Sequence, residues 1–351
     1  MDLFSPLSLG SAELKNRVIM APMTRSRASV VAVPSSLTAE YYGQRADAGL
    51  LITEGTGTSP MGMGYARTPG IYNAEQIAAW KTVTGAVHAK GGRIFLQLMH
   101  VGRIAHSANR TIADAPVAPS AIAAAGQMWT DSGGMQPNDT PRALELSEIP
   151  GVIAEFAQAT RNALAAGFDG VELHAASGYL PMQFLNTGSN QRTDQYGGSA
   201  GNRVRFVVET LEAMVQAAGD AGRVGMKVSP GMKFNDIHDD DPMGTHVTLV
   251  DAIARLGLAY LHLMRTGIGA EDSLRAAWEG NLLLGGGFQK AEADAVIAAG
   301  KAEAIVFGTS YLANPDLVNR LRTDAPLNNQ PNPATFYTPG PEGYLDYPTL
   351  A

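Results

Sequence analysis

Residues 149–174 read IPGVIAEFAQATRNALAAGFDGVELH and contain the repeating unit that decides the fold. Apolar residues in the first part recur three and four positions apart, which predicts an amphipathic helix with Ser147 as its N-terminal cap. Residues 170–174 form a short and almost wholly apolar run, typical of a parallel strand that is covered on both faces. A helix followed by a buried strand is the unit from which α/β folds are built.

The same unit recurs along the chain. Further stripes of helical period occupy residues 204–215 and 291–299, and the strand-like runs are residues 18–23, 50–54, 93–99, 170–174, 224–228, 259–264, 281–284 and 304–307. Eight strands alternating with helices predict a (β/α)8 TIM barrel, which we expect to form a single domain over residues 1–351. A doubly wound open sheet is the structural alternative, but such sheets usually carry a glycine fingerprint after the first strand, where residues 21–25 read APMTR.

Two segments fall outside the repeat. Residues 104–146 are too long for an ordinary turn and are rich in Ala, Pro, Ser and Gly, so we expect an extended excursion after the third strand. The tail after Leu321 contains many prolines and is irregular, but it also carries Phe336, Tyr337, Tyr344 and Tyr347. Aromatic side chains of this kind predict that the tail packs back on the barrel.

Composition excludes several classes of protein. The chain has 351 residues, 45% of them hydrophobic, and no cysteine, which rules out disulfides, thiolate metal sites and thiol nucleophiles. The net charge of −7 is spread without a basic face, so we expect no nucleic-acid partner. No apolar run reaches the about 20 residues of a membrane helix, and the first residues lack the pattern of a signal peptide. We therefore expect a cytoplasmic enzyme, present as a monomer or homodimer.

The active site of such a barrel lies at the carboxyl ends of its strands. The polar residues there are Thr24, Gln97, His100, His174, Ser177, Tyr179, Lys227 and Ser229. Glycine-rich turns at residues 285–287 and 308–310 follow the last two strands, where barrel enzymes tend to bind a phosphate group. His238 lies beside residues 239–241, which are all Asp, but we interpret this segment as a solvated loop and predict no metal site.

Six sequence motifs, which follow one another along the whole chain, point to a particular protein family. They are APMTR at 21–25, GYARTPGI at 64–71, QLMHVGR at 97–103, VELHAASGYL at 171–180, SNQRTDQYGGS at 189–199 and EGYLDYP at 342–348. Together they closely resemble the old yellow enzyme family, nearest its N-ethylmaleimide and nitrate-ester reductase branch. The resemblance implies an FMN-dependent ene-reductase with ping-pong kinetics. NADPH or NADH reduces the flavin and leaves, and a small electron-poor alkene (an enone, enal, maleimide or nitroalkene) then takes a hydride from the flavin.

The resemblance also implies roles for individual residues. His174 and Tyr179 are the expected catalytic pair: His174 donates a hydrogen bond to the substrate oxygen, and Tyr179 delivers a proton to the alkene carbon. The expected substrate-binding residues are His174, Ser177, Tyr65, Met99 and Tyr344. The expected FMN-binding residues are Pro22, Met23, Thr24, Gly55, Gln97, Lys227, Gly286, Gly287, Gly308 and Thr309.

Four residues depart from the family pattern. The family usually has His or Asn at Ser177, Arg at Lys227 and Thr309, and Trp at Met99. These departures motivate an alternative: a degenerate member that binds a small phenol or carbonyl compound with little turnover. A third hypothesis is a flavin-free barrel enzyme acting on a phosphorylated metabolite. Lys227 itself has a structural alternative, a charge pair with Glu54 or Glu172.

Overall fold

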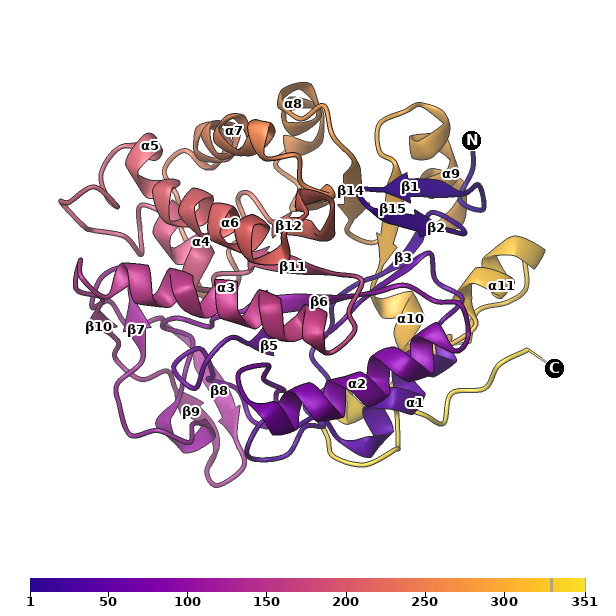
Figure 1. The fold of residues 1–351 in the computed structure, drawn as a ribbon, viewed down its shortest axis with the longest axis horizontal. Helices are drawn as coiled ribbons and strands as arrows, with labels where there is room; N and C mark the ends of the chain where they lie inside the picture. The colour runs from indigo at the N-terminus through magenta and orange to yellow at the C-terminus, as the bar shows by residue number, and fades with distance from the viewer. Residues whose placement is uncertain (329–330, 351) are drawn as a thin grey trace.

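Eight parallel strands lie at the centre of the molecule (Figure 1), and the computed structural model describes residues 1–328 and 331–350. In chain order the strands are β3 (Val18–Met20), β4 (Leu50–Ile52), β6 (Ile94–Met99), β11 (Gly170–Ala175), β12 (Val224–Val228), β13 (Tyr260–Met264), β14 (Leu282–Gly285) and β15 (Ala304–Phe307). Each strand pairs in parallel with the next, and β15 pairs with β3. The sheet is therefore closed, which confirms the predicted barrel.

The register of the strands decides which side chains meet inside the barrel. His174 on β11 pairs with Lys227 on β12, and Lys227 pairs with His262 on β13. Glu172 on β11 pairs with Gln97 on β6. Partners in a parallel pair share a face, and residues two apart on a strand share it too. These five polar side chains therefore lie together at one end of the barrel, while Val171 and Leu173 pack in the main hydrophobic cluster outside it.

Helices surround the barrel (Figure 1). The longer ones are α1 (Ser36–Gln44), α2 (Ala74–His88), α3 (Ile149–Ala165), α6 (Arg205–Ala218), α7 (Pro242–Ile253), α8 (Ala270–Ala277), α9 (Lys290–Ala298) and α11 (Leu317–Thr323). Three short helices, α4 (Leu180–Leu185), α5 (Ala200–Arg203) and α10 (Thr309–Ala313), fill the connections. The predicted cap of α3 was wrong: Glu148 precedes the helix, and its carboxylate binds Arg142 at 2.7 and 2.8 Å instead of capping it.

An N-terminal hairpin closes the amino end of the barrel. Strands β1 (Leu7–Leu9) and β2 (Ala12–Leu14) pair in antiparallel fashion, and their apolar residues pack with Phe95, Tyr260 and Leu283 from inside the barrel. The N–H of Ser11 at the turn donates to the carbonyl of Gly222, just before β12, at 3.0 Å. The sequence patterns did not predict this hairpin, and it leaves the carboxyl end as the open face.

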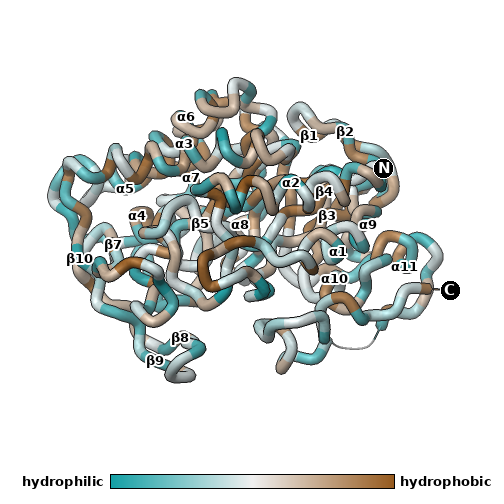
Figure 2. Tube along the Cα trace, turned by 60° about the horizontal axis from the view of Figure 1, so that its bottom comes forward, coloured by the Kyte–Doolittle hydropathy of each residue, from teal (hydrophilic) through white to brown (hydrophobic). Residues whose placement is uncertain are grey.

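The excursion after the third strand has structure of its own. β7 (Val117–Ala118) pairs with β10 (Arg142–Ala143), and β8 (Gln127–Thr130) forms a hairpin with β9 (Gly134–Pro137). The hairpin projects from the body in both views (Figures 1 and 2). A further short strand, β5 (Thr56–Gly57), pairs with β6, and single 3-10 turns lie at η1 (Ser107–Asn109), η2 (Ala221–Arg223), η3 (Phe234–Asp236), η4 (Ala254–Leu256) and η5 (Pro333–Thr335).

The C-terminal tail packs back on the barrel, as predicted. Two buried arginines that follow β3 hold it through its backbone carbonyls. Arg27 donates to the carbonyls of Thr335, Phe336, Gly340 and Glu342 at 2.8–3.1 Å, and Arg25 donates to that of Gly343 at 2.7 Å. These bonds tie the end of the chain to its beginning.

Candidate active site

A cavity of about 430 Å³ opens at the carboxyl ends of β12, β13, β14, β15 and β3. This volume lies within the range of ordinary ligand pockets. Seven of the predicted cofactor residues line it: Pro22, Met23, Lys227, Gly286, Gly287, Gly308 and Thr309. Its other lining residues are Ala21, His262, Met264, Gly285, Phe288, Gln289, Val306, Phe307 and Ser310. Among the residues that the structure describes, the cavity lining carries one full charge, that of Lys227.

One end of the cavity is a glycine cradle. Gly286 has φ +123°, which side chains rarely allow, and a Cβ built there would lie 3.0 Å from the Cβ of Arg265. Gly287 also has a positive φ, of +80°. Backbone this bare lets a phosphate group approach its N–H groups. The residues present therefore fit the phosphate end of FMN, although Thr309 supplies no charge there.

Three predicted cofactor residues lie outside this lining: Thr24, Gly55 and Gln97. Thr24 is half-buried beside Arg25, whose N–H donates to Glu54 at 3.1 Å. Burial raises the pKa of Glu54 to about 7, against the opposing effect of the Arg25 N–H and of both nearby arginine charges. A Cβ on Gly55 would lie 2.6 Å from the sulfur of Met99, so Met99 is sufficient reason for glycine at that position.

His174 presents a neutral imidazole with a defined tautomer. Burial lowers its pKa well below the usual range, and the charges of Lys227 and His262 act in the same direction. The N–H of Ala176 donates to Nδ1 of His174 at 3.3 Å. Nδ1 is therefore the acceptor, and the proton of the neutral ring lies on Nε2. His174 can donate a hydrogen bond from Nε2 without carrying charge.

Tyr179 lies directly beside this imidazole. The two rings meet edge to face with centroids 4.8 Å apart, and the Tyr179 hydroxyl donates to that of Tyr65 at 3.2 Å. Burial raises the pKa of Tyr179 well above its usual range, and the neighbouring Tyr65 adds to the effect. Met99 packs in the same apolar cluster. The structure thus brings together His174, Tyr179, Tyr65 and Met99, with Tyr179 protonated.

Ser177 adopts a backbone conformation that is uncommon for serine. Its φ is +56°, its N–H donates to Ser229 at 3.0 Å, and its carbonyl accepts from Asn235 at 2.8 Å. Asn and His are enriched at such left-handed positions. The residues usual at this position in the family therefore suit the backbone better than serine does.

Tyr344 does not join the other predicted substrate-binding residues. It is fully buried and stacks on Tyr41 with ring centroids 4.1 Å apart, beneath the guanidinium of Arg27. A ring with no exposed surface cannot wall an open pocket, so the expected role of Tyr344 is corrected to packing of the tail. Tyr337, which is 58% exposed, lies near enough to Tyr65 and Tyr179 to affect the pKa of both.

Sequence reasoning missed four residues of the site. Asn235 has φ +62°, donates to the carbonyl of Ser177 at 2.8 Å, and lies near enough to Tyr65 and Tyr179 to lower the pKa of both. Tyr337, described in the preceding paragraph, is the second missed residue. Glu172 accepts from Gln97 Nε2 at 2.7 Å and from His262 Nδ1 at 2.9 Å. A signal existed for Glu172 and His262, because each is a polar residue inside a strand that is otherwise apolar.

Lys227 lies among these strand residues. Burial lowers its pKa, and the charge of Glu172 partly offsets that effect. No ion pair forms between Lys227 and Glu54 or Glu172 within the described residues. Lys227 is thus left with its ammonium group free at the cavity.

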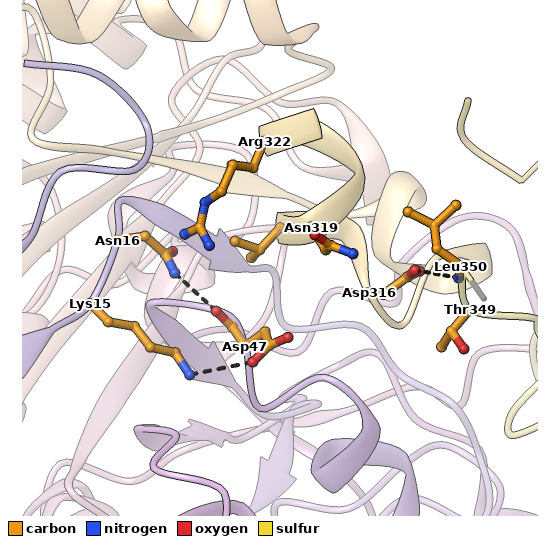
Figure 3. A pocket seen from close by; sticks show the side chains of 9 residues that line it. Lys15, Asn16, Asp47, Asp316, Asn319, Arg322, Thr349 and Leu350 are labelled. Carbon is orange, nitrogen blue, oxygen red and sulfur yellow. Dashed lines mark hydrogen bonds and ion pairs between the residues drawn. The ribbon is translucent and has the colours of Figure 1, made fainter. Parts of the chain in front are cut away.

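A second hollow, of about 260 Å³, lies elsewhere (Figure 3). Asn16 and Asp47 in its wall precede β3 and β4, so this hollow is at the amino end of the barrel. Lys15 lies 3.6 Å from Asp47, and Asp316 accepts from the N–H of Leu350 at 2.8 Å. Lys15 and Asp47 form an ion pair in its wall, and the hollow shares no residue with the cavity at the carboxyl ends.

The described residues are 1–328 and 331–350. They contain no helix long and apolar enough to cross a membrane. They also contain no group of three His, Asp or Glu side chains placed to hold a metal ion.

A family model described as the NADH:flavin oxidoreductase / NADH oxidase family matches residues 2–328. The chain belongs to this family. A probable flavin mononucleotide-dependent alkene reductase of Leishmania infantum is 44% identical, over 99% of this chain and 97% of that protein. The 12-oxophytodienoate reductase 7 of Oryza sativa subsp. japonica is 41% identical, over 99% and 94%.

Solved structures of the family have the same fold. Morphinone reductase in complex with tetrahydroNAD superposes with a TM-score of 0.95 at 46% identity, covering 100% of this chain and 98% of that one. The old yellow enzyme homologue from Zymomonas mobilis superposes with a TM-score of 0.96 at 38% identity, covering both chains fully. The predicted resemblance, barrel, FMN cofactor and alkene-reductase class are confirmed. The flavin-free hypothesis is therefore wrong.

Proposed function

We propose that His174 and Tyr179 carry the reduction of small activated alkenes: enones, enals, maleimides and nitroalkenes. The observation behind this proposal is the pairing of a neutral imidazole, protonated on Nε2, with a buried and protonated phenol at a ring distance of 4.8 Å. The first group is a hydrogen-bond donor and the second a proton donor, and reduction of a polarised alkene needs both.

Bound FMN would supply the hydride. Nε2 of His174 donates to the carbonyl or nitro oxygen of the substrate and stabilises the negative charge that develops on it. The hydroxyl of Tyr179 transfers its proton to the alkene carbon next to the activating group, and the hydride that bound FMN would supply goes to the other alkene carbon, which completes the addition. Tyr65 accepts a hydrogen bond from that hydroxyl at rest and keeps it near the substrate.

The other residues bind and orient the substrate and the flavin. Tyr65 and Met99 form an apolar wall beside Tyr179, and Ser177 offers a short hydroxyl as a second donor to the substrate oxygen. Pro22, Met23, Thr24, Gly55, Gln97 and Lys227 would hold the flavin ring, and Gly286, Gly287, Gly308 and Thr309 would hold its phosphate. Lys227 places one positive charge near the pyrimidine end of the ring, without the planar fork of an arginine.

We further propose that NADPH or NADH serves as the donor by stacking on the flavin, and that the kinetics are ping-pong. Residues 1–351 act as a single domain in this proposal, as a monomer or homodimer in the cytoplasm, where both nicotinamide donors are at hand. The partner is a small molecule; nucleic acid and membrane have no role in it.

The test follows the two half-reactions on the purified protein by flavin absorbance. NADH or NADPH should bleach the flavin bands without oxygen, and 2-cyclohexenone or N-ethylmaleimide should then restore them in a single exponential phase. Bleaching without recovery on any activated alkene would contradict the proposal.

A second candidate rests on Ser177, Lys227, Thr309 and Met99, which depart from the family pattern. It is a protein that binds a small phenol or carbonyl compound with little turnover. In the same experiment it predicts a long-wavelength absorbance change on adding a phenol, with recovery by alkenes no faster than by buffer alone.

A further inference from the structure

Glu172 is the most completely enclosed carboxylate at the open end of the barrel, and the proposed mechanism does not use it. Its side chain is 0% exposed on β11, two residues before His174. It accepts hydrogen bonds from two neighbouring strands, from Gln97 Nε2 at 2.7 Å and from His262 Nδ1 at 2.9 Å. All three side chains are almost fully buried, so these bonds are not exchanged with water.

These two bonds decide which polar atoms of Gln97 and His262 remain free to bind a ligand. A carboxylate only accepts, so Gln97 must turn its NH2 group toward Glu172 and leave Oε1 on the other side. Burial lowers the pKa of His262, which keeps the ring neutral; with its proton on Nδ1, Nε2 is an acceptor. Within the described residues neither Oε1 of Gln97 nor Nε2 of His262 has a partner, and neither is among the sealed polar atoms.

The two open acceptors lie on different strands, and of the two only His262 belongs to the lining of the cavity of about 430 Å³. Gln97 is in register with Glu172, whereas His262 lines the cavity between Lys227 on β12 and Gly285 on β14. Along the carboxyl end of the barrel, His262 on β13 thus lies between His174 on β11 and the glycine cradle that follows β14. An oxidised flavin has one ring N–H, at N3, and its ribityl chain carries hydroxyl donors.

We infer that Glu172 is a positioning residue: it holds Gln97 with Oε1, and His262 with Nε2, as acceptors for the N3–H group and for a ribityl hydroxyl of FMN. The inference rests on the proposed function, because it requires FMN in this cavity. Glutamine at position 172 could accept from one partner only while offering the other an NH2 group, so the two acceptors could no longer be fixed together.

The decisive variant is Glu172→Gln, prepared as holoenzyme with 15N-labelled FMN. We expect the FMN dissociation constant to rise about tenfold, the range of one or two lost hydrogen bonds. We also expect the proton signal of N3–H to move upfield from its position in the unaltered enzyme. Glu303→Gln is the matched control, since Glu303 accepts from the N–H of Leu282 at the opposite end of β14. It should leave the signal in place.

A second variant keeps the test open if Glu172→Gln does not fold. His262→Phe should weaken binding of riboflavin several-fold but leave lumiflavin, which has no ribityl chain, unchanged. An unmoved N3–H signal in Glu172→Gln, or an equal loss of both flavins in His262→Phe, would overturn the inference. Failure of the unaltered protein to bind FMN would instead contradict the proposed function.

Discussion

At the ends of β11 and β12 the site consists of side chains that fix one another, whereas at the ends of β14 and β15 it consists of bare backbone. Glu172, His174 and Lys227 depend on particular atoms at particular distances, such as the 2.7 Å bond from Gln97. Gly286 and Gly287 need only the absence of a side chain. The first region should therefore respond to loss of single atoms, and the second to added bulk or added charge.

The largest effect is expected for Tyr179→Phe in the side-chain region. Loss of the proton donor should slow alkene reduction by about 100-fold or more, while reduction of the flavin by the nicotinamide donor stays unchanged. Stopped-flow absorbance separates the two half-reactions. Tyr196→Phe, which also loses a buried phenol hydroxyl bonded to Glu209, is the control. Equal slowing of both half-reactions would count against Tyr179 as the proton donor.

Gly286→Ala tests the backbone region. At φ +123° a methyl group costs about 1–3 kcal/mol and crowds Arg265, so FMN should bind roughly 10- to 100-fold more weakly. Flavin fluorescence quenching gives the dissociation constant. Gly219→Ala, at φ +70° with open space around it, should lower the thermal midpoint without changing FMN affinity. Similar affinities in the two variants would mean that the cradle does not hold the phosphate.

Ser177→Asn sharpens the comparison, because it adds a side-chain donor where the backbone already suits asparagine. We expect alkene reduction to become about tenfold faster, since one well-placed donor to a developing oxyanion contributes at least that much. The rate with 2-cyclohexenone measures it, and Ser177→Ala should show the contribution of the present hydroxyl. A rate in Ser177→Asn no higher than in the unaltered protein would place position 177 outside substrate contact.

Thr309→Arg adds charge to the backbone region. Thr309 is exposed at the start of α10, so a guanidinium there should tighten FMN by only about three- to tenfold. Riboflavin, which lacks the phosphate, should bind as before. Equal tightening of both flavins would show that the gain does not come from the phosphate.

The smallest effect is expected from pH. Burial lowers the pKa of His174 from its ordinary value of 6.5 and raises that of Tyr179 from 10, so the imidazole stays neutral and the phenol protonated across neutrality. The rate of alkene reduction by pre-reduced enzyme should therefore vary less than about threefold between about pH 6 and pH 9. A break near pH 6.5 would mean that His174 titrates as an exposed histidine does.

The barrel could be predicted because each of its strands lies in a short run that is almost wholly apolar, and the side-chain region because its motifs are local. Residues 171–180 place His174, Ser177 and Tyr179 without any long-range contact. The other residues of the site reach it from segments that are distant in the sequence, and local motifs cannot predict such contacts. Asn235 reaches the site through a loop with positive φ, Glu172 acts through bonds to two other strands, and Tyr337 arrives from the tail. Tyr344 was misplaced because an aromatic motif does not say which ring faces the pocket.

The bonds from Arg25 and Arg27 to the tail have a consequence for the order of synthesis. The first barrel strand, β3, needs the last strand, β15, as its neighbour, and the arginines that follow it need carbonyls as late as Gly343. During synthesis, the guanidinium groups of Arg25 and Arg27 therefore stay solvated by water until residues 335–343 have been added. Arg27 and Arg25 bind backbone carbonyls, which every residue has, so amino-acid substitutions in the tail should leave these bonds in place. A premature stop codon shortly before residue 335 is not tolerated, because it would remove every tail carbonyl that the two cations bind and leave them only Tyr41 and the carbonyl of Arg25.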